Sequence, residues 1–91
     1  MSEQWTFLTN YGHVIIFLDK HPDATVREIS DQIGITERAV LKIISDLAHD
    51  GYLEIKKNGR NNSYIINANK TLRHKLEKSC KIKRFIQIIE N

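Results

Sequence analysis

Histidine and cysteine, the residues best suited to metal binding or nucleophilic catalysis, are sparse in this 91-residue sequence. The histidines His13, His21, His49 and His74 stand at separations unlike those of a metal-binding pair, and Cys80 is the single cysteine. His13 lies in an apolar segment, where we expect a hydrogen-bonded core residue. A redox role for Cys80 requires an exposed, activated thiol, and the alternative is an inert, half-buried side chain. Since the glycines are isolated rather than gathered in a phosphate loop, we predict no enzyme, no metal and no cofactor.

Hydrogen bonding to a polyanion is the second kind of chemistry that the residues suggest. Arg38 and Lys42 are one helical turn apart and can reach base acceptors or phosphates, while Leu41 suits contact with a thymine methyl group. Thr36 and Ser45 offer hydroxyl groups to phosphates. The complete candidate set on this segment is Thr36, Glu37, Arg38, Leu41, Lys42 and Ser45.

A second candidate set follows closely in the sequence. Lys56, Lys57 and Arg60 have no acidic residue among them and are followed by Asn61 and Asn62. Such a cluster attracts a polyanion, and it stands out because residues 1–69 carry seven Lys/Arg against nine Asp/Glu, a net charge of −2. Residues 70–91 carry seven Lys/Arg against two Asp/Glu, a net charge of +5, so basicity is local.

Two helices are predicted in the first third of the chain. Apolar residues at helical spacing predict one over residues 7–20, and the His-Pro-Asp triplet that follows ends it. Thr25 with Glu28 has the capping-box spacing and opens a second, short helix, which Gly34 closes.

A third helix, a hairpin and a fourth helix complete the prediction. The third helix extends from Glu37 to about Asp50, with Thr36 as its N-cap. Two strand-like runs within residues 52–67 flank an Asn-Gly pair, which is a strong hairpin signal. A final helix is expected over residues 69–91, because apolar residues lie roughly along one side of it: Leu72, Leu76, Ile82, Phe85, Ile86 and Ile89.

Two short helices joined by a glycine-containing turn are typical of a helix-turn-helix, in which the second helix enters the major groove of DNA. Alone this pattern also fits an ordinary helical pair with a solvated outer face. The basic hairpin directly after it favours a wing, whose cations hold phosphates or enter a minor groove. Lysines that only protect a hairpin edge are the alternative. We therefore predict a mainly α fold with a small β-hairpin (α+β), a winged helix-turn-helix.

The blocks "LTNYGHVIIFL", "ITERAVLKIISDLAHDGYLEIKKNGRNNSYIIN" and "TLRHKLE" resemble small, free-standing winged-helix transcriptional regulators of prokaryotes, related to the MarR and ArsR groups. The resemblance spans most of the chain. It implies that the segment from Thr36 to Lys42 belongs to a recognition helix and that Lys57, Arg60 and Asn62 belong to a wing. This chain departs from the pattern at Asn61, where members often have a second arginine, and in the tail "KSCKIKRFIQIIEN", which is more cationic.

Length and composition predict one domain over residues 1–91, with an N-terminal helix within 1–22, a helix-turn-helix at 25–50, a wing at 52–67 and a C-terminal dimerisation helix at 69–91. No apolar run approaches the roughly 20 residues of a membrane span, and the start resembles no export signal, so a cytoplasmic protein without a membrane partner is expected.

Large apolar residues near both termini exceed what so short a chain can cover, and they predict a homodimer. The interface residues expected are Trp5, Phe7, Ile82, Phe85, Ile86 and Ile89. A final helix that packs back across the first helix within one protomer is the alternative.

These observations together predict a homodimeric, sequence-specific regulator that binds double-stranded DNA, most simply a repressor, with no small-molecule effector evident. Two alternatives remain open. A winged helix can present the same surface to a protein, and the acidic residues Glu37, Asp46 and Asp50 suit that role. It can also bind RNA, although the hairpin offers few aromatic residues for stacking.

Overall fold

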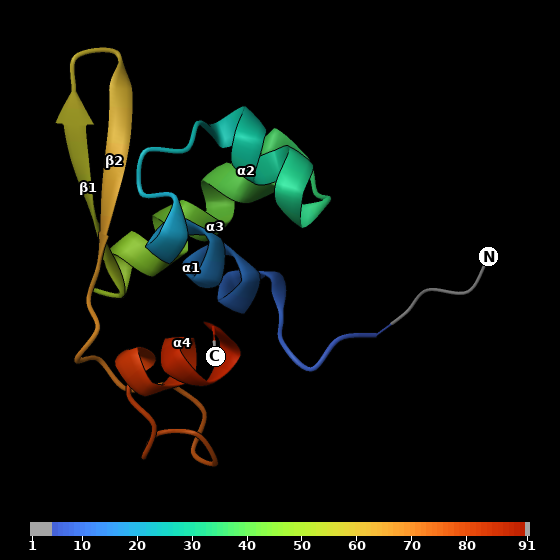
Figure 1. Cartoon of the computed structure of the whole chain (residues 1–91), viewed down its shortest axis with the longest axis vertical. Helices are drawn as coiled ribbons and strands as arrows, with labels where there is room; N and C mark the ends of the chain where they lie inside the picture. The colour runs from blue at the N-terminus through green and yellow to red at the C-terminus, as the bar shows by residue number, and fades with distance from the viewer. Residues whose placement is uncertain (1–4, 91) are drawn as a thin grey trace.

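Four helices and a two-stranded hairpin follow one another in the predicted order (Figure 1). The computed structural model describes residues 5–90. The helices are α1 (Asn10–Lys20), α2 (Val26–Ile33), α3 (Glu37–His49) and α4 (Ile82–Glu90), and the strands β1 (Leu53–Asn58) and β2 (Asn61–Ile66) pair antiparallel. The predicted fold class, a winged helix-turn-helix with the hairpin as its wing, is confirmed.

The predicted capping box opens α2. Thr25 Oγ1 accepts a hydrogen bond from the Glu28 backbone N–H at 3.1 Å, and Glu28 Oε1 accepts one from the Thr25 N–H at 2.8 Å. Gly34 ends the helix with φ 85°, a left-handed conformation that only glycine adopts at little cost. The turn into α3 is thereby fixed by local chemistry.

Thr36 opens α3 by accepting a hydrogen bond from the Ala39 N–H at 3.1 Å on its side-chain oxygen. Val40, Ile43, Ile44 and Leu47 then form the buried face of the helix. Since these residues fix which side of α3 faces inward, the polar residues between them must face outward.

The core lies where α1, α2 and α3 meet. Val14, Leu18, Ile29 and Val40 are fully buried there, and each such side chain contributes roughly 1.5–3 kcal/mol by leaving water. The hairpin joins this core through its base, because Leu53 and Tyr64 are buried and the Tyr64 N–H donates to the Pro22 carbonyl at 3.0 Å. The wing is therefore anchored at one end, and its tip extends away from the helices (Figure 1).

The first helix begins three residues later than predicted. Thr9, with extended backbone angles (φ −77°, ψ 173°), is its N-cap, so Phe7 and Leu8 precede the helix. Phe7 is 92% exposed, which shows that its apolar side chain does not extend the helix face.

The C-terminal helix begins at Ile82, so the prediction of one helix from about residue 69 is wrong. Residues 72–80 form a loop instead, closed by a bridge between Thr71 and Lys81 and by a hydrogen bond from the Leu72 N–H to the Cys80 carbonyl at 2.9 Å. A helix through this segment would place lysines three residues apart on one face, where like charges repel. The Leu76 side chain, expected on the apolar face, is 82% exposed.

The protomer buries two residues that the sequence assigned to a dimer interface. Ile82 and Ile86 are 3% and 7% exposed and belong to the core cluster, because α4 packs back beneath α1 (Figure 1). The Phe85 ring of α4 lies close to Gly12 of α1, since a Cβ atom at Gly12 would be 3.6 Å from it, an ordinary contact distance. Ile82 and Ile86 are therefore core residues, and the assignment of both to the interface is corrected.

Within residues 5–90, no helix has both the length and the apolar character that crossing a membrane requires.

Candidate nucleic-acid interface

The outward face of α3 carries the first candidate set. Thr36, Glu37, Arg38, Leu41, Lys42 and Ser45 are all exposed, and Leu41 keeps 56% of its surface in solvent. An exposed leucine among polar residues is suited to contact with the methyl group of thymine, and the neighbouring side chains can reach base edges or phosphates. The structure thus brings this set together on one side of one helix.

The two cations of α3 differ in their surroundings. Among the described residues, Arg38 forms no ion pair, whereas Lys42 Nζ lies 3.3 Å from Asp46 Oδ2. The same oxygen accepts a hydrogen bond from the Tyr11 hydroxyl at 2.6 Å. Arg38 is therefore free to reach a ligand, and Lys42 must exchange its partner to do so.

The contact between Tyr11 and Asp46 was not visible in the sequence, because the two residues are 35 positions apart. The Tyr11 hydroxyl, followed by the Lys42 ammonium, lowers the pKa of Asp46, and the hydrogen bond to Asp46 raises the pKa of Tyr11. At neutral pH the pair is thus a carboxylate and a neutral phenol. It links α1 to the exposed side of α3 and fixes a negative charge beside Lys42.

Strand alternation assigns the wing residues to two faces. Lys57 lies opposite Asn62 in the ladder, on the same face as the buried Leu53 and Tyr64, so both point to the side of the hairpin that meets the helices. Asn62 is half-buried there.

The outer face of the hairpin carries Lys56, which lies opposite Ser63 and pairs with Glu54 at 3.6 Å. The sequence pattern predicted the same DNA-binding role for Lys56 and Lys57. The structure separates them, because only Lys57 shares a face with the residues that anchor the hairpin to the helices.

The wing turns through Gly59 and Arg60, the two residues between the paired Asn58 and Asn61. Gly59 has φ 65°, and no other residue of the hairpin among those described has a positive φ, which is the pattern of a type II′ turn. Arg60 and Asn61 are exposed at this tip, which Figure 1 shows projecting beyond the helices.

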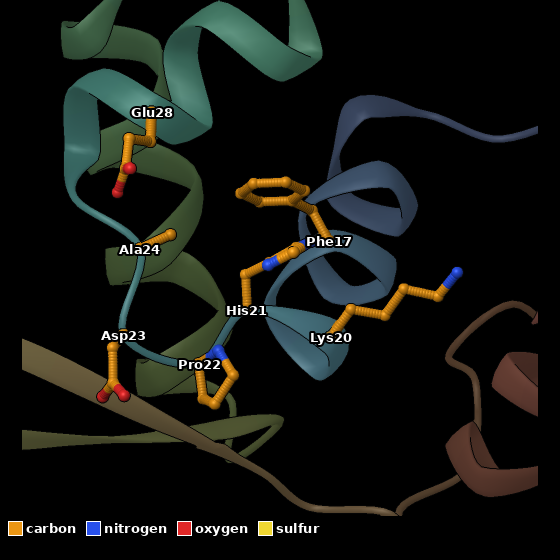
Figure 2. Close-up of a pocket in the computed structure, with 7 residues that line it drawn as sticks. All are labelled: Phe17, Lys20, His21, Pro22, Asp23, Ala24 and Glu28. Carbon is orange, nitrogen blue, oxygen red and sulfur yellow. The ribbon is translucent and has the colours of Figure 1, made fainter.

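A cavity of about 340 Å³ lies at the connection between α1 and α2, and no set of charged side chains converges on it (Figure 2). Its charged side chains diverge, because Lys20 and Asp23 point away from Glu28, whose carboxylate already caps α2. The ring of His21 lies against that of Phe17, with centroids 4.7 Å apart and the ring planes tilted by 36°. Among residues 5–90, no three His, Cys, Asp or Glu side chains are grouped so that they could hold a metal ion.

The three-helix unit with its glycine turn and anchored hairpin defines a winged helix-turn-helix, the class of domain found in many DNA-binding regulators. The sequence pattern of a family described as "Winged helix-turn-helix DNA-binding" matches residues 13–54, from α1 to the second residue of β1. Both cations of α3, Arg38 and Lys42, lie inside the matched range, and the tip of the wing lies outside it.

One similar solved structure is that of the zinc-dependent MarR family transcriptional regulator AdcR in its Zn(II)-bound state. The two chains superpose with a TM-score of 0.55 and share 24% sequence identity over 74% of this chain. This chain spans about half of that structure, 48% of its length. No curated protein sequence shows significant similarity to this chain. The likeness to AdcR establishes the fold, which agrees with the resemblance seen in the sequence.

Proposed function

We propose that this protein is a sequence-specific regulator of transcription that binds double-stranded DNA as a homodimer and represses by covering a promoter. The observation that carries the proposal is the outward face of α3, where Arg38, Leu41 and Ser45 are exposed on a helix that is held by its buried face. A rigidly held helix of this kind can present a fixed pattern of donors to base edges in the major groove.

The wing supports the same proposal through phosphate contacts. Lys57 and Asn62 lie side by side on the face of the hairpin that meets the helices, and Arg60 occupies the tip. With α3 in a major groove, we expect Lys57 to contact a neighbouring phosphate and Arg60 to enter the adjacent minor groove.

Dimerisation is supported by apolar side chains that the protomer leaves in solvent. Trp5 and Phe7 precede α1, and Ile88 and Ile89 end α4, all of them exposed, while Phe85 is half-buried. A two-fold interface through these residues would cover them and would place two copies of α3 about one DNA turn, roughly 34 Å, apart.

Selection of binding sites from a pool of random duplex DNA by the purified protein tests the proposal. We expect an inverted repeat with half-sites about 10 base pairs apart, and a slope of log K against log[salt] of about −5 to −7 if each protomer neutralises three or four phosphates. A single enriched half-site would reject the homodimer but would still support sequence-specific DNA binding. No enrichment, with weak and uniform binding, would instead favour a protein partner for the same surface.

A further inference from the structure

Tyr11 of α1 contacts the outward side of α3 without belonging to that helix. Its hydroxyl donates a hydrogen bond of 2.6 Å to Asp46 Oδ2, and Lys42 Nζ lies 3.3 Å from the same oxygen. Tyr11 also precedes residues 13–54, which match the winged helix-turn-helix pattern. The tyrosine therefore reaches, from outside that pattern, an ion pair on the helix that we propose to read DNA.

The two partners of Asp46 hold its carboxylate unequally. A strong hydrogen bond from a hydroxyl to a carboxylate is about 2.5–2.7 Å long, and the contact with Tyr11 falls in this range. Hydrogen bonds from an ammonium group to a carboxylate are usually about 2.7–2.9 Å long, so the contact with Lys42 is long. The lysine also precedes the aspartate by four residues, which is the less favourable order for an ion pair on a helix. Tyr11 is therefore the main partner of Asp46, and Lys42 is the weaker one.

Solvent exposure decides which of the two contacts can be exchanged. The Lys42 and Asp46 side chains are 74% and 39% exposed, and an exposed ion pair contributes little to stability. Lys42 can therefore leave Asp46 for a phosphate or a base at small cost. The phenol of Tyr11, in contrast, is carried by α1, whose buried face fixes the helix on the core. The carboxylate consequently stays with Tyr11 when the lysine moves.

We infer that Tyr11 is a positioning residue for DNA binding, because it holds the Asp46 carboxylate toward α1 and so lets Lys42 turn to the DNA. Without the hydroxyl, Lys42 would be the hydrogen-bond partner left to Asp46 among the described residues, and the aspartate would retain it. A carboxylate free to rotate would also bring its negative charge nearer to the phosphates, which repel it. Both effects weaken DNA binding. The role rests on the proposed DNA binding.

Tyr11→Phe tests the inference, because it removes the hydroxyl and keeps the ring. We expect the variant to bind the selected DNA duplex about threefold to fivefold more weakly than the wild type, the range for one exposed ion pair. Tyr52→Phe is the matched control, since the Tyr52 hydroxyl also donates at 2.6 Å, but to the Thr71 carbonyl. The control should keep its DNA affinity within about twofold. Fluorescence anisotropy measures both variants, and equal losses would reject a positioning role for Tyr11.

A double-variant cycle shows whether Tyr11 acts through Asp46. Asp46→Asn should bind DNA at least as tightly as the wild type, because the carboxylate that pairs with Lys42 is gone. Adding Tyr11→Phe to this variant should cause no further loss, since the two changes affect the same contact. A loss of the same size in both backgrounds would show that the tyrosine acts by packing or by touching the DNA, which overturns the inference.

The DNA-free protein provides a second, independent readout. The Tyr11 hydroxyl is the largest cause of the lowered pKa of Asp46, so Tyr11→Phe should raise that pKa toward its ordinary value of 3.8. The NMR shift of the Asp46 carboxyl carbon, followed through a pH titration, measures the change. An unchanged pKa would mean that the hydroxyl does not hold the carboxylate, and the inference would be rejected whatever the DNA affinities are.

These outcomes separate the inference from the proposed function. Failure of the wild type to bind any DNA duplex would reject the proposed function, and the role of Tyr11 with it. DNA binding that Tyr11→Phe leaves unchanged would reject the role of Tyr11 alone, and the proposed function would stand.

Discussion

Two regions of the molecule carry most of its positive charge, and they differ in how their cations are held. The proposed DNA-binding surface, residues 36–46 of the helix-turn-helix and 54–62 of the wing, has five Lys/Arg and three Asp/Glu, a net charge of +2. The C-terminal basic segment, residues 73–84, has six Lys/Arg and one Glu, a net charge of +5. The region with the smaller charge lies on a helix and a hairpin, whereas residues 73–81 of the other region lie in a loop.

The two regions differ in whether their cationic side chains are held in a fixed direction. Lys42 pairs with Asp46, and Lys56 pairs with Glu54, on a helix and a strand whose buried faces set their directions. Within the C-terminal basic segment, Arg73 alone forms an ion pair among the described residues. Exposed ion pairs add little stability, so their effect here is on position. Net charge indicates where a polyanion is attracted, and oriented side chains indicate where sequence is read.

Among the variants considered, Arg38→Ala is expected to have the largest effect on DNA affinity. The variant should lose on the order of 1 to 3 kcal/mol on the selected DNA site and relax preference at one base position, with little change on random DNA. Competition binding against both DNAs measures the difference, with Lys75→Ala as the control from the C-terminal basic segment. Equal losses on both DNAs would show that Arg38 does not recognise a specific base.

The two neighbouring lysines of the wing provide the next test. Lys57→Ala should weaken binding to all sequences about equally and reduce the magnitude of the salt slope by about one. Lys56→Ala should do less, because Lys56 lies on the outer face of the hairpin and already pairs with Glu54. Anisotropy titrations at several salt concentrations compare the two variants. A larger loss for Lys56→Ala would contradict the assignment of hairpin faces.

Neutralising the loop of the C-terminal basic segment should have a smaller and uniform effect. The triple variant Lys75→Gln, Lys78→Gln and Lys81→Gln should lower affinity for selected and random DNA together at low salt, and the effect should fade as the Debye length shortens to about 8 Å at physiological salt. The ratio of the affinities for selected and random DNA, measured by competition, should stay within about twofold of the wild-type ratio. A change in that ratio would show that this segment also reads sequence.

The smallest expected effect concerns the pH dependence of stability. Because the pKa of Asp46 is lowered in the folded protein, its contribution is present above the ordinary value of 3.8 and is lost as the pH falls through the lowered pKa. Wild type should therefore lose stability relative to Asp46→Asn below pH 3.8, as measured by denaturant unfolding at a series of pH values. Parallel curves for the two proteins would show that the contact with Tyr11 has no energetic role.

The helix-turn-helix could be predicted from the sequence because its signals are local. The hydrogen bonds between Thr25 and Glu28, the left-handed Gly34 and the N-cap Thr36 each depend on residues no more than five positions apart. The hairpin could also be predicted, since an Asn-Gly pair between β-branched and aromatic runs is a strong hairpin signal, although the turn itself is formed by Gly59 and Arg60.

Features that depend on distant residues could not be predicted in this way. A loop closed by the bridge between Thr71 and Lys81 stands where the spacing of apolar residues predicted a helix. This bridge joins residues ten positions apart, which a local pattern does not reveal. The burial of Ile86 follows from the packing of α4 on core residues that lie far away in the sequence, among them Val14 and Leu18 of α1. The contact of Tyr11 with Asp46 joins helices that the sequence separates.

The closed loop between Thr71 and Lys81 also has a practical consequence for protein engineering. Its two ends are fastened by the backbone bridge, while Leu76 in its middle is exposed to solvent. Extra residues inserted beside Leu76 would therefore extend outward without displacing α4, and doubling the loop costs only about 0.6 kcal/mol of closure entropy. A peptide tag or a surface-attachment sequence placed here would leave both the wing and the chain termini unmodified.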